Sequence, residues 1–281
     1  MRRPIPLFRK LIVELQANCN RECFFCNREF DQSGKRYDSR GRKVLKRMPS
    51  EQAISILDQA RDMGFRGHVA FHHYSEPFLD DRIIEMAQAA RARGMLPYEH
   101  TNGDVLRRND ALCRAAVEVF DYLVVGLYDY TSDAELEQEI AFWRDRLRGI
   151  RHLRFSLGGQ VFPRTLTPHD ARMFREKKSY PDGPCHRPAV RLILHYDGEM
   201  ALCCEDMQDR FELGNAFETP IEQLWYGEKH VRIMKALQKG RREQFALCAG
   251  CPIPPPEPVP LAARIRRPAQ RAIAFARRAV A

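Results

Sequence analysis

The sequence predicts an α/β fold in which a parallel sheet is covered by helices, followed by a smaller α+β region. Short β-rich runs alternate with helical patterns up to about residue 160, and such alternation is typical of parallel sheets. The pattern changes after Pro163, where a Pro-Asp-Gly-Pro turn at 181–184 precedes the pattern of a hairpin. Because the active sites of such sheets form at the C-terminal ends of the strands, we expect functional residues directly after the strands.

Strands are expected where β-branched and aromatic residues gather between turn signals. They are Leu11–Gln16, His68–Tyr74, Leu96–His100, Tyr122–Tyr128 and His152–Leu157. The segments between them place apolar residues at helical spacing, which predicts helices. These run from Ser50, as the N-cap, to Gly64, and over about 81–93, 109–119 and 133–147.

The C-terminal region is expected to begin with a hairpin. Val190–Tyr196 and Glu199–Cys203 flank an Asp-Gly pair, which is a strong turn signal, and a helix is predicted over Ile221–Leu237. Prolines are so dense within residues 252–260 that regular structure cannot continue, and we place a domain end there. The expected organisation is a core over 1–163, a second domain over 164–258 and a basic tail over 259–281.

The net charge of +9 is concentrated in two segments, residues 34–48 and residues 259–281. Basic residues in a loop and a tail do not form the basic face that nucleic-acid binding needs, so we expect no nucleic-acid partner. We expect the tail to be a frayed appendage, with a helix on an anionic membrane surface as the alternative. The sequence shows no long apolar run and no secretory signal, which predicts a cytoplasmic protein.

Three cysteines follow the first predicted strand at the spacing C-x3-C-x2-C, namely Cys19, Cys23 and Cys26. Three thiolates can bind three irons of a [4Fe-4S] cluster and leave the fourth iron open to a small molecule. A ferredoxin closes that position with a fourth cysteine, and a structural zinc site needs four ligands. No fourth Cys or His lies in this run, so the spacing favours an open cluster.

This spacing resembles the signature of the radical S-adenosylmethionine (SAM) superfamily. The resemblance implies a partial (β/α)6 barrel in which the open iron binds SAM. Reductive cleavage of SAM would then yield a 5′-deoxyadenosyl radical that abstracts a hydrogen atom from the substrate. The resemblance also implies that Phe25, the aromatic residue before the third cysteine, lies near the adenine.

Further positions match this family at strand ends. Glu76, in Tyr-Ser-Glu-Pro after the second strand, would hold the SAM ammonium, although Tyr74 and Ser75 replace two glycines of the family's pattern. Asn102, in Thr-Asn-Gly, and Ser156, at the end of the fifth strand, are further candidates for SAM contacts. The alternatives are a surface glutamate at position 76 and an ordinary turn at position 102.

A second set of cysteines resembles the ligands of the SPASM/Twitch domains of radical SAM enzymes. The set is Cys185, Cys203, Cys248 and Cys251, and no cysteine follows it, which fits the shorter Twitch form. The resemblance implies a second [4Fe-4S] cluster with a role in electron transfer. A four-cysteine zinc site is the alternative.

Cys204 is left over beside Cys203, since adjacent residues on a strand point to opposite faces. It is either a buried apolar residue or a catalytic thiol that donates a hydrogen atom to a substrate radical, as a cysteine does in related epimerases. Glu205 and Asp206 either face the cavity or cap a turn, and Cys113 is expected in the core. Candidates for the substrate pocket are His72, His73, Tyr74, Tyr128 and Asp129.

The predicted function is that of a small radical SAM/Twitch oxidoreductase. The cysteine spacing looks like that of a Twitch dehydrogenase, which favours oxidation of an alcohol on a carbohydrate or another small molecule. A radical SAM epimerase, a peptide-modifying enzyme and a non-enzymatic zinc or iron–sulfur module are the alternatives. The expected cofactors are SAM and two [4Fe-4S] clusters. The expected partners are a small-molecule substrate and an electron donor such as flavodoxin or ferredoxin.

Overall fold

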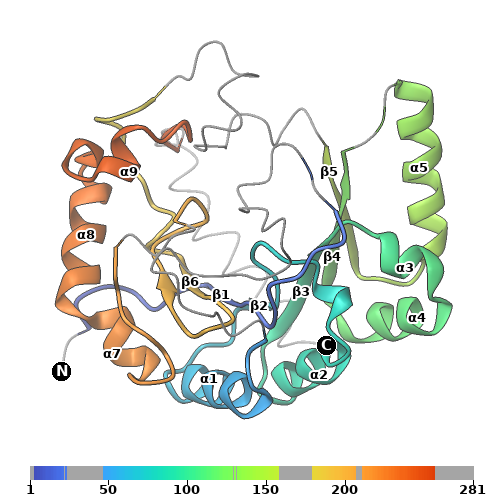
Figure 1. The fold of residues 1–281 in the computed structure, drawn as a ribbon, viewed down its shortest axis with the longest axis horizontal. Helices are drawn as coiled ribbons and strands as arrows, with labels where there is room; N and C mark the ends of the chain where they lie inside the picture. Colours follow the sequence, from blue (N-terminus) through green and yellow to red (C-terminus); the bar gives the residue numbers. More distant parts are fainter. Residues whose placement is uncertain are drawn as a thin grey trace, which may run out of the picture.

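The computed structural model describes residues 3–21, 23, 47–128, 130, 132–157, 179–206 and 211–256. Its centre is one sheet of seven strands in the order β5-β4-β3-β2-β1-β6-β7, flanked by helices (Figure 1). Several predictions fall outside the described residues. They concern Phe25, Cys26, Asp129, residues 34–46 of the basic loop and the tail 259–281.

Six strands of the sheet run parallel, as a partial barrel requires. They are β1 (Lys10–Val13), β2 (His68–Ala70), β3 (Leu96–Thr101), β4 (Tyr122–Leu127), β5 (His152–Leu157) and β6 (Arg191–Leu194). The short β7 (Met200–Ala201) pairs antiparallel with β6 around the predicted Asp-Gly turn. β6 pairs directly with β1. The sheet therefore includes strands from both sides of residue 163, where the first domain was expected to end.

Two strands, β1 and β2, end three and four residues before their predicted ends, because the chain leaves the ladder to form turns. β1 ends at Val13 rather than Gln16, and β2 ends at Ala70 rather than Tyr74. The side chain of Gln16 donates instead to the backbone carbonyls of Asn18 (3.1 Å) and Glu76 (2.8 Å). The turns after β1 and β2 are thus tied to each other at the C-terminal edge of the sheet.

Five helices accompany the first five strands. They are α1 (Ser50–Asp62), α2 (Ile83–Ala92), α3 (Asp104–Arg108), α4 (Asp110–Val119) and α5 (Asp133–Arg146). The later elements are α7 (Ile221–Tyr226), α8 (Glu228–Gln238) and α9 (Ala246–Ala249), with the 3-10 helices η1 (Pro77–Leu79) and η4 (Arg242–Gln244). No helix of the described segments is both long enough and apolar enough to cross a membrane.

Two helix predictions were wrong in detail, and one helix was missed. Ser50 is the first residue of α1 rather than its N-cap, and its hydroxyl accepts a hydrogen bond from Arg82 Nη1 (2.9 Å) instead of capping the helix. α3 was not predicted, because five residues are too few to show helical spacing. The helix predicted over Ile221–Leu237 is broken at Gly227, whose ψ of 144° separates α7 from α8.

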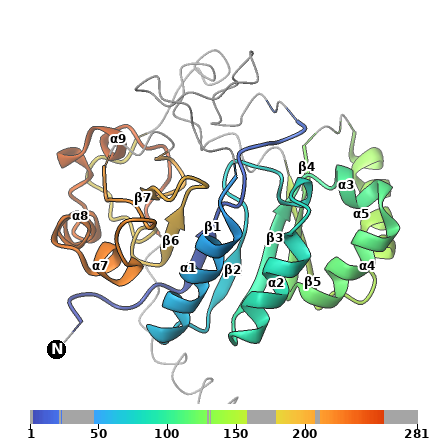
Figure 2. The ribbon, with the colours of Figure 1, turned by 60° about the horizontal axis from the view of Figure 1, so that its bottom comes forward.

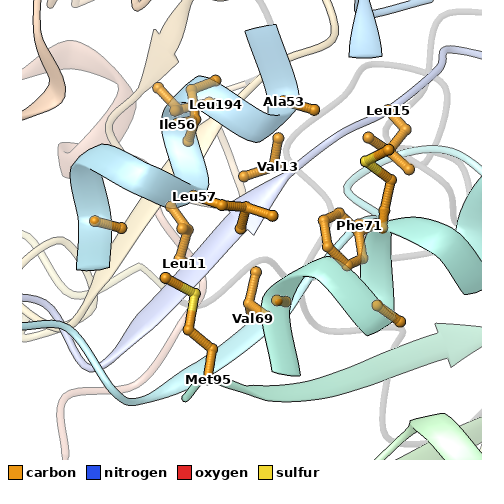
Figure 3. Packing of buried hydrophobic residues seen from close by; sticks show 14 of the residues in the cluster. Leu11, Val13, Leu15, Ala53, Ile56, Leu57, Val69, Phe71, Met95 and Leu194 are labelled. Atoms are coloured by element: carbon orange, nitrogen blue, oxygen red, sulfur yellow. The ribbon is translucent and has the colours of Figure 1, made fainter. Parts of the chain in front are cut away.

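The sheet packs two different apolar faces. Leu11 and Val13 of β1 pack against Ile56 and Leu57 of α1 (Figure 3), and Cys113 is buried in the same cluster, as predicted. Alternate strand residues point to the other face and form a second cluster. It comprises Ile12, Ala70, Tyr98, Tyr122, Val124, Ile193 and Ala201. Figure 2 shows α1 and α2 lying along one side of the sheet, so the second cluster marks the inner face of the barrel.

The C-terminal helices lie at one end of the sheet. α7, α8 and α9 lie beside β6, whereas α3, α4 and α5 lie at the opposite end near β5 (Figure 1). A third apolar cluster joins the segment after β7 to α8 and α9. Its buried members are Leu202, Phe211, Ile233, Leu237 and Cys248.

Candidate active site

The first cysteine lies beside the turn that follows β3. Cys19 and Cys23 are both partly buried. The side-chain amide of Asn102 donates to Asn20 Oδ1 (2.8 Å) and lies 3.9 Å from Cys19 Sγ. The structure therefore brings Asn102 next to the predicted ligands of the first cluster.

Gly103 shapes this turn. Its φ of 84° lies in the left-handed region, which glycine tolerates best. A Cβ atom at this position would also lie 2.4 Å from Cζ2 of Trp143. Trp143 belongs to α5 and is 2% exposed, so the outer helix packs directly on the Thr-Asn-Gly turn.

Glu76 joins the segments that follow β1, β2 and β3. Its side chain is 2% exposed. It accepts hydrogen bonds from Thr101 Oγ1 (2.7 Å) and from the backbone N–H groups of Asn102 (2.7 Å) and Phe78 (3.2 Å). Burial raises the pKa of Glu76 to about 7, and the hydrogen bonds oppose this shift. Glu76 is therefore a buried carboxylate beside Asn102 rather than a surface residue.

The residues that replace the two family glycines make contacts of their own. The backbone N–H of Tyr74 donates to Glu14 Oε1 (2.9 Å), and its hydroxyl donates to the backbone carbonyl of Cys204. The turn after β2 is thereby tied to the segment after β7. The hydroxyl of Ser75 is buried without a hydrogen-bond partner in the described part of the chain.

Ser156 lies apart from this network. It faces Gly126 across the β4–β5 ladder, and β4 separates β5 from β3 in the sheet. Within the described ranges, no hydrogen bond links Ser156 to Glu76 or Asn102. The structure thus brings Cys19, Glu76 and Asn102 together but leaves Ser156 two strands away.

Two of the predicted auxiliary cysteines lie at the third apolar cluster. Cys185 packs against this cluster, and Cys248 belongs to it. Burial raises the pKa of Cys248 to about 12, and the neighbouring charges of Cys185 and Cys251 reinforce the shift. Burial likewise raises the pKa of Cys203, whose Sγ accepts the N–H of Glu205 (3.4 Å). That these four buried or half-buried thiols bind one iron–sulfur cluster stays a prediction.

Arg242 braces two of these cysteine segments. Its side chain is buried, and Nη1 and Nη2 donate to the carbonyls of Ile253 (2.7 Å) and Pro184 (2.9 Å). Pro184 precedes Cys185 and Ile253 follows Cys251. One guanidinium therefore holds together segments that are far apart in the sequence.

Cys204 has polar rather than apolar neighbours. Arg187 Nη1 donates to its Sγ (3.1 Å), and the thiol lies 3.7 Å from Glu205 Oε1. Burial and the charge of Glu205 raise the pKa of Cys204, against the opposite effect of Arg187, so the thiol stays protonated. Asp206 accepts the N–H of Leu202 (3.1 Å) and thus caps the turn, which was one of its two predicted roles.

The predicted pocket residues His72 and Tyr128 have neighbours at the sheet edge. His72 Nδ1 is in hydrogen-bond contact with the fully buried Glu99. Burial lowers the pKa of His72 to about 3, so its ring is neutral. The ring of Tyr128 covers Gly126 of β4.

Sequence reasoning missed Glu14, the buried charged residue that contacts Tyr74 and His195. It is 1% exposed, and its Oε2 lies 3.2 Å from His195 Nδ1. Burial would raise the pKa of Glu14, but the hydrogen bond and charge of His195, the charge of His73 and the N–H of Tyr74 lower it to about 2. A charged residue within a predicted buried strand was the one signal that could have found Glu14.

Comparisons with known proteins reveal two similar sequences. An iron-sulfur cluster-binding domain, SPASM, matches residues 185–252. The S-adenosyl-L-methionine-dependent 2-deoxy-scyllo-inosamine dehydrogenase of Niallia circulans is 24% identical over 258 residues, which cover 87% of this chain and 93% of the relative.

Two solved structures share the fold. BtrN in complex with AdoMet and 2-DOIA matches with a TM-score of 0.68 and 19% identity, over 88% of this chain and 94% of that one. Native anSMEcpe with bound AdoMet matches with a TM-score of 0.53 and 14% identity, over 86% and 89% of the two chains. The predicted resemblance to radical SAM enzymes with a SPASM/Twitch-type auxiliary-cluster domain is therefore confirmed, in sequence by the dehydrogenase and the SPASM match and in fold by BtrN.

Proposed function

We propose that this chain is a radical SAM dehydrogenase that oxidises an alcohol of a carbohydrate-like small molecule. The observation that carries the proposal is the meeting of Cys19, Glu76 and Asn102 at the C-terminal edge of β1, β2 and β3. A second support is the relative from Niallia circulans, which acts on 2-deoxy-scyllo-inosamine and aligns over most of both chains.

The cofactors supply the radical chemistry. When bound, one [4Fe-4S] cluster and SAM would supply a radical able to abstract a hydrogen atom from the carbinol carbon, and a second cluster would take up the electron lost by the substrate and return it to the first cluster or to the donor. The net change is that the alcohol becomes a ketone, SAM becomes methionine and 5′-deoxyadenosine, and one proton is released to solvent. A one-electron donor such as flavodoxin or ferredoxin starts the first turnover.

The chain's own residues hold these groups. Cys19, Cys23 and Cys26 bind the first cluster, and Cys185, Cys203, Cys248 and Cys251 bind the second. Glu76 receives the SAM ammonium, because a buried carboxylate pairs strongly with a cation. Asn102 orients SAM from the other side of the turn. Phe25 contacts the adenine, and Ser156 makes at most a weak SAM contact, since it lies two strands from the Glu76 network.

The test is a cysteine replacement with two readouts. In the Cys19→Ala/Cys23→Ala/Cys26→Ala variant, 5′-deoxyadenosine formation should be lost, while about half of the roughly eight irons expected from two clusters should remain. Undiminished 5′-deoxyadenosine from this variant would contradict the assignment. Retention of one zinc in place of the second four irons would favour the four-cysteine zinc site.

A radical SAM epimerase is the second candidate, because burial raises the pKa of the Cys204 thiol and keeps it protonated although Arg187 Nη1 lies 3.1 Å from its Sγ. A protonated thiol can return a hydrogen atom to a substrate radical. We propose dehydrogenation first, because the relative of known activity is a dehydrogenase.

The two reactions differ in the mass of the product. With a substrate such as 2-deoxy-scyllo-inosamine, the dehydrogenase yields a product two hydrogens lighter, whereas an epimerase yields one of unchanged mass. Cys204→Ala should leave an oxidised product, and Cys113→Ala serves as the matched control for loss of a buried thiol. Loss of an inverted product in Cys204→Ala, with 5′-deoxyadenosine still formed, would establish the epimerase.

A further inference from the structure

Three side chains with metal-binding atoms, none of them a cysteine, meet at the C-terminal edge of the sheet. Glu14 follows β1, His73 lies in the turn after β2 and His195 follows β6. One ligand atom from each lies within 4.8 Å of the other two. Because β6 and β2 flank β1 in the sheet, three strand ends converge on one point.

The orientation of Glu14 suits a ligand. Its Oε1 accepts the backbone N–H of Tyr74 (2.9 Å), and its Oε2 points at His195 Nδ1 (3.2 Å). Two ligand atoms that share one tetrahedral metal at about 2.1 Å lie about 3.4 Å apart, close to this separation. A backbone hydrogen bond on the outer carboxylate oxygen is also typical of metal ligands, because it fixes their direction.

The ion pair between Glu14 and His195 does not explain the surroundings of His73. Both of its ring nitrogens are buried, and neither has a hydrogen-bond partner in the described segments. Its ring lies 4.8 Å from that of His195 and 4.0 Å from that of Tyr74. Buried polar atoms are nearly always satisfied, so this imidazole calls for a group that accepts its nitrogen lone pair.

A carboxylate and two imidazoles are a donor set that first-row divalent metals prefer, whereas Mg²⁺ and Ca²⁺ favour oxygen ligands. We propose that Glu14, His73 and His195 bind one divalent first-row transition metal ion, with Zn²⁺ as the probe of choice. The site is separate from both cysteine sets and differs from them in donor chemistry.

Three protein ligands leave coordination positions open, as in catalytic rather than structural zinc sites. The site lies near the segment of Cys203 and Cys204, since Tyr74 packs on His73 and its hydroxyl donates to the carbonyl of Cys204. The open positions would take hydroxyl or amino groups of the substrate. This last step rests on the proposed function, whereas metal binding itself does not.

The test measures zinc binding to the holoenzyme without SAM or substrate. The protein carries both clusters, is treated briefly with EDTA and desalted under anaerobic conditions, and is then titrated with Zn²⁺ by calorimetry. We expect one zinc per chain beyond an unchanged iron content. Anomalous scattering at the zinc edge should place the ion between Glu14, His73 and His195.

The variants His73→Gln, His195→Gln and Glu14→Gln should each bind zinc at least about tenfold more weakly, since even loss of a partner behind a metal ligand costs that much. His152→Gln, which changes an exposed histidine on β5, is the matched control and should bind as the parent does. A variant is compared with the parent only if it keeps the parent's iron content and melting temperature.

No zinc beyond the clusters, or an anomalous peak on the cysteines alone, would overturn the proposal, and so would equal zinc affinity in folded His73→Gln. Should a variant fail to fold, the anomalous map of the parent protein decides by itself. Failure of the proposed function would instead appear as an absence of 5′-deoxyadenosine with zinc binding intact, so the two failures are distinguishable.

Discussion

The two cysteine regions of this molecule sit in opposite surroundings. Around Cys19 the neighbours are polar, with the amides of Asn20 and Asn102, and Arg21 paired with Asp104 at 2.6 Å. Around Cys248 the neighbours are apolar. They are Leu202, Phe211, Ile233 and Leu237, with Cys185 packed beside them.

The difference corresponds to the two proposed roles. A cluster that binds SAM must be reachable by a charged ligand, and a polar rim around half-buried thiols allows that. A cluster that only takes up an electron is better enclosed, because burial excludes water and other ligands. Burial also raises the pKa of the enclosed thiols, so assembly of the second cluster must release protons that the folded chain holds tightly.

The largest effect is expected when the enclosed cluster loses a ligand. Cys248→Ala should lower the free energy of unfolding by on the order of 4 kcal/mol, or roughly 10 °C, since metal-binding energy here is folding energy. Cys19→Ala, at a half-buried thiol, should cost less than about 1 kcal/mol. Anaerobic thermal unfolding of the two variants measures the difference in stability. Equal shifts of the melting temperature would contradict the contrast between an enclosed and an accessible cluster.

The next effect concerns Arg242. Arg242→Met leaves the carbonyls of Pro184 and Ile253 without their donor, and should cost about 2–3 kcal/mol because the lost hydrogen bonds come from a charged group. It should also loosen the second cluster without affecting the first. The matched control is Arg241→Met, at the neighbouring exposed arginine. Iron content and denaturant unfolding measure both, and an unchanged iron content would contradict the bracing role.

The third effect is on SAM affinity at Glu76. With a pKa of about 7, Glu76 must lose a proton before it can pair with an ammonium, so affinity should fall as the pH is lowered. Between pH 8 and pH 6 the dissociation constant should rise about tenfold, because only about a tenth of the carboxyl groups are ionised at the lower pH. Glu76→Gln should weaken binding and abolish this dependence.

Equilibrium binding of SAM at several pH values measures this prediction. Glu85→Gln, at an exposed glutamate of α2, is the control and should keep the pH dependence of the parent. A pH-independent affinity in the parent protein would mean that Glu76 does not contact the ammonium.

The smallest effect is expected at Ser156. It lies on β5, two strands from the Glu76 network, so Ser156→Ala should change SAM affinity by less than about threefold, or about 0.6 kcal/mol. The same binding assay applies. A tenfold or larger loss of SAM affinity in this variant would show that the SAM site extends from the Glu76 network to β5.

The sequence predicted what local patterns encode. The strands and long helices were found because their side-chain periodicity reports which face is buried. Each of the two predicted cysteine groups has a member whose surroundings the structure describes. Cys19 lies beside the amide of Asn102, and Cys248 lies in an apolar cluster. The turn at Gly227 and the short α3 were missed, because neither disturbs the hydrophobic spacing enough to be seen.

What could not be predicted depends on contacts between distant segments. Glu14 and His195 are 181 positions apart, and only the parallel pairing of β1 with β6 brings them together. Cys204 was left open between two interpretations, because nothing near it in the sequence announces the guanidinium of Arg187. From the sequence, Arg242 likewise looks like one of many surface charges, because its two carbonyl partners are known only from the structure.

The packing of Trp143 on Gly103 gives the protein a built-in optical reporter. The chain has two tryptophans, and Trp225 lies at the other end of the fold, where its indole donates to the carbonyl of Pro6 (3.1 Å). Trp225→Phe would leave Trp143 as the single indole emitter, in van der Waals contact with the Thr-Asn-Gly turn. Its fluorescence should then be quenched as the first cluster is loaded and shift again as SAM binds, so occupancy could be followed in real time without a label.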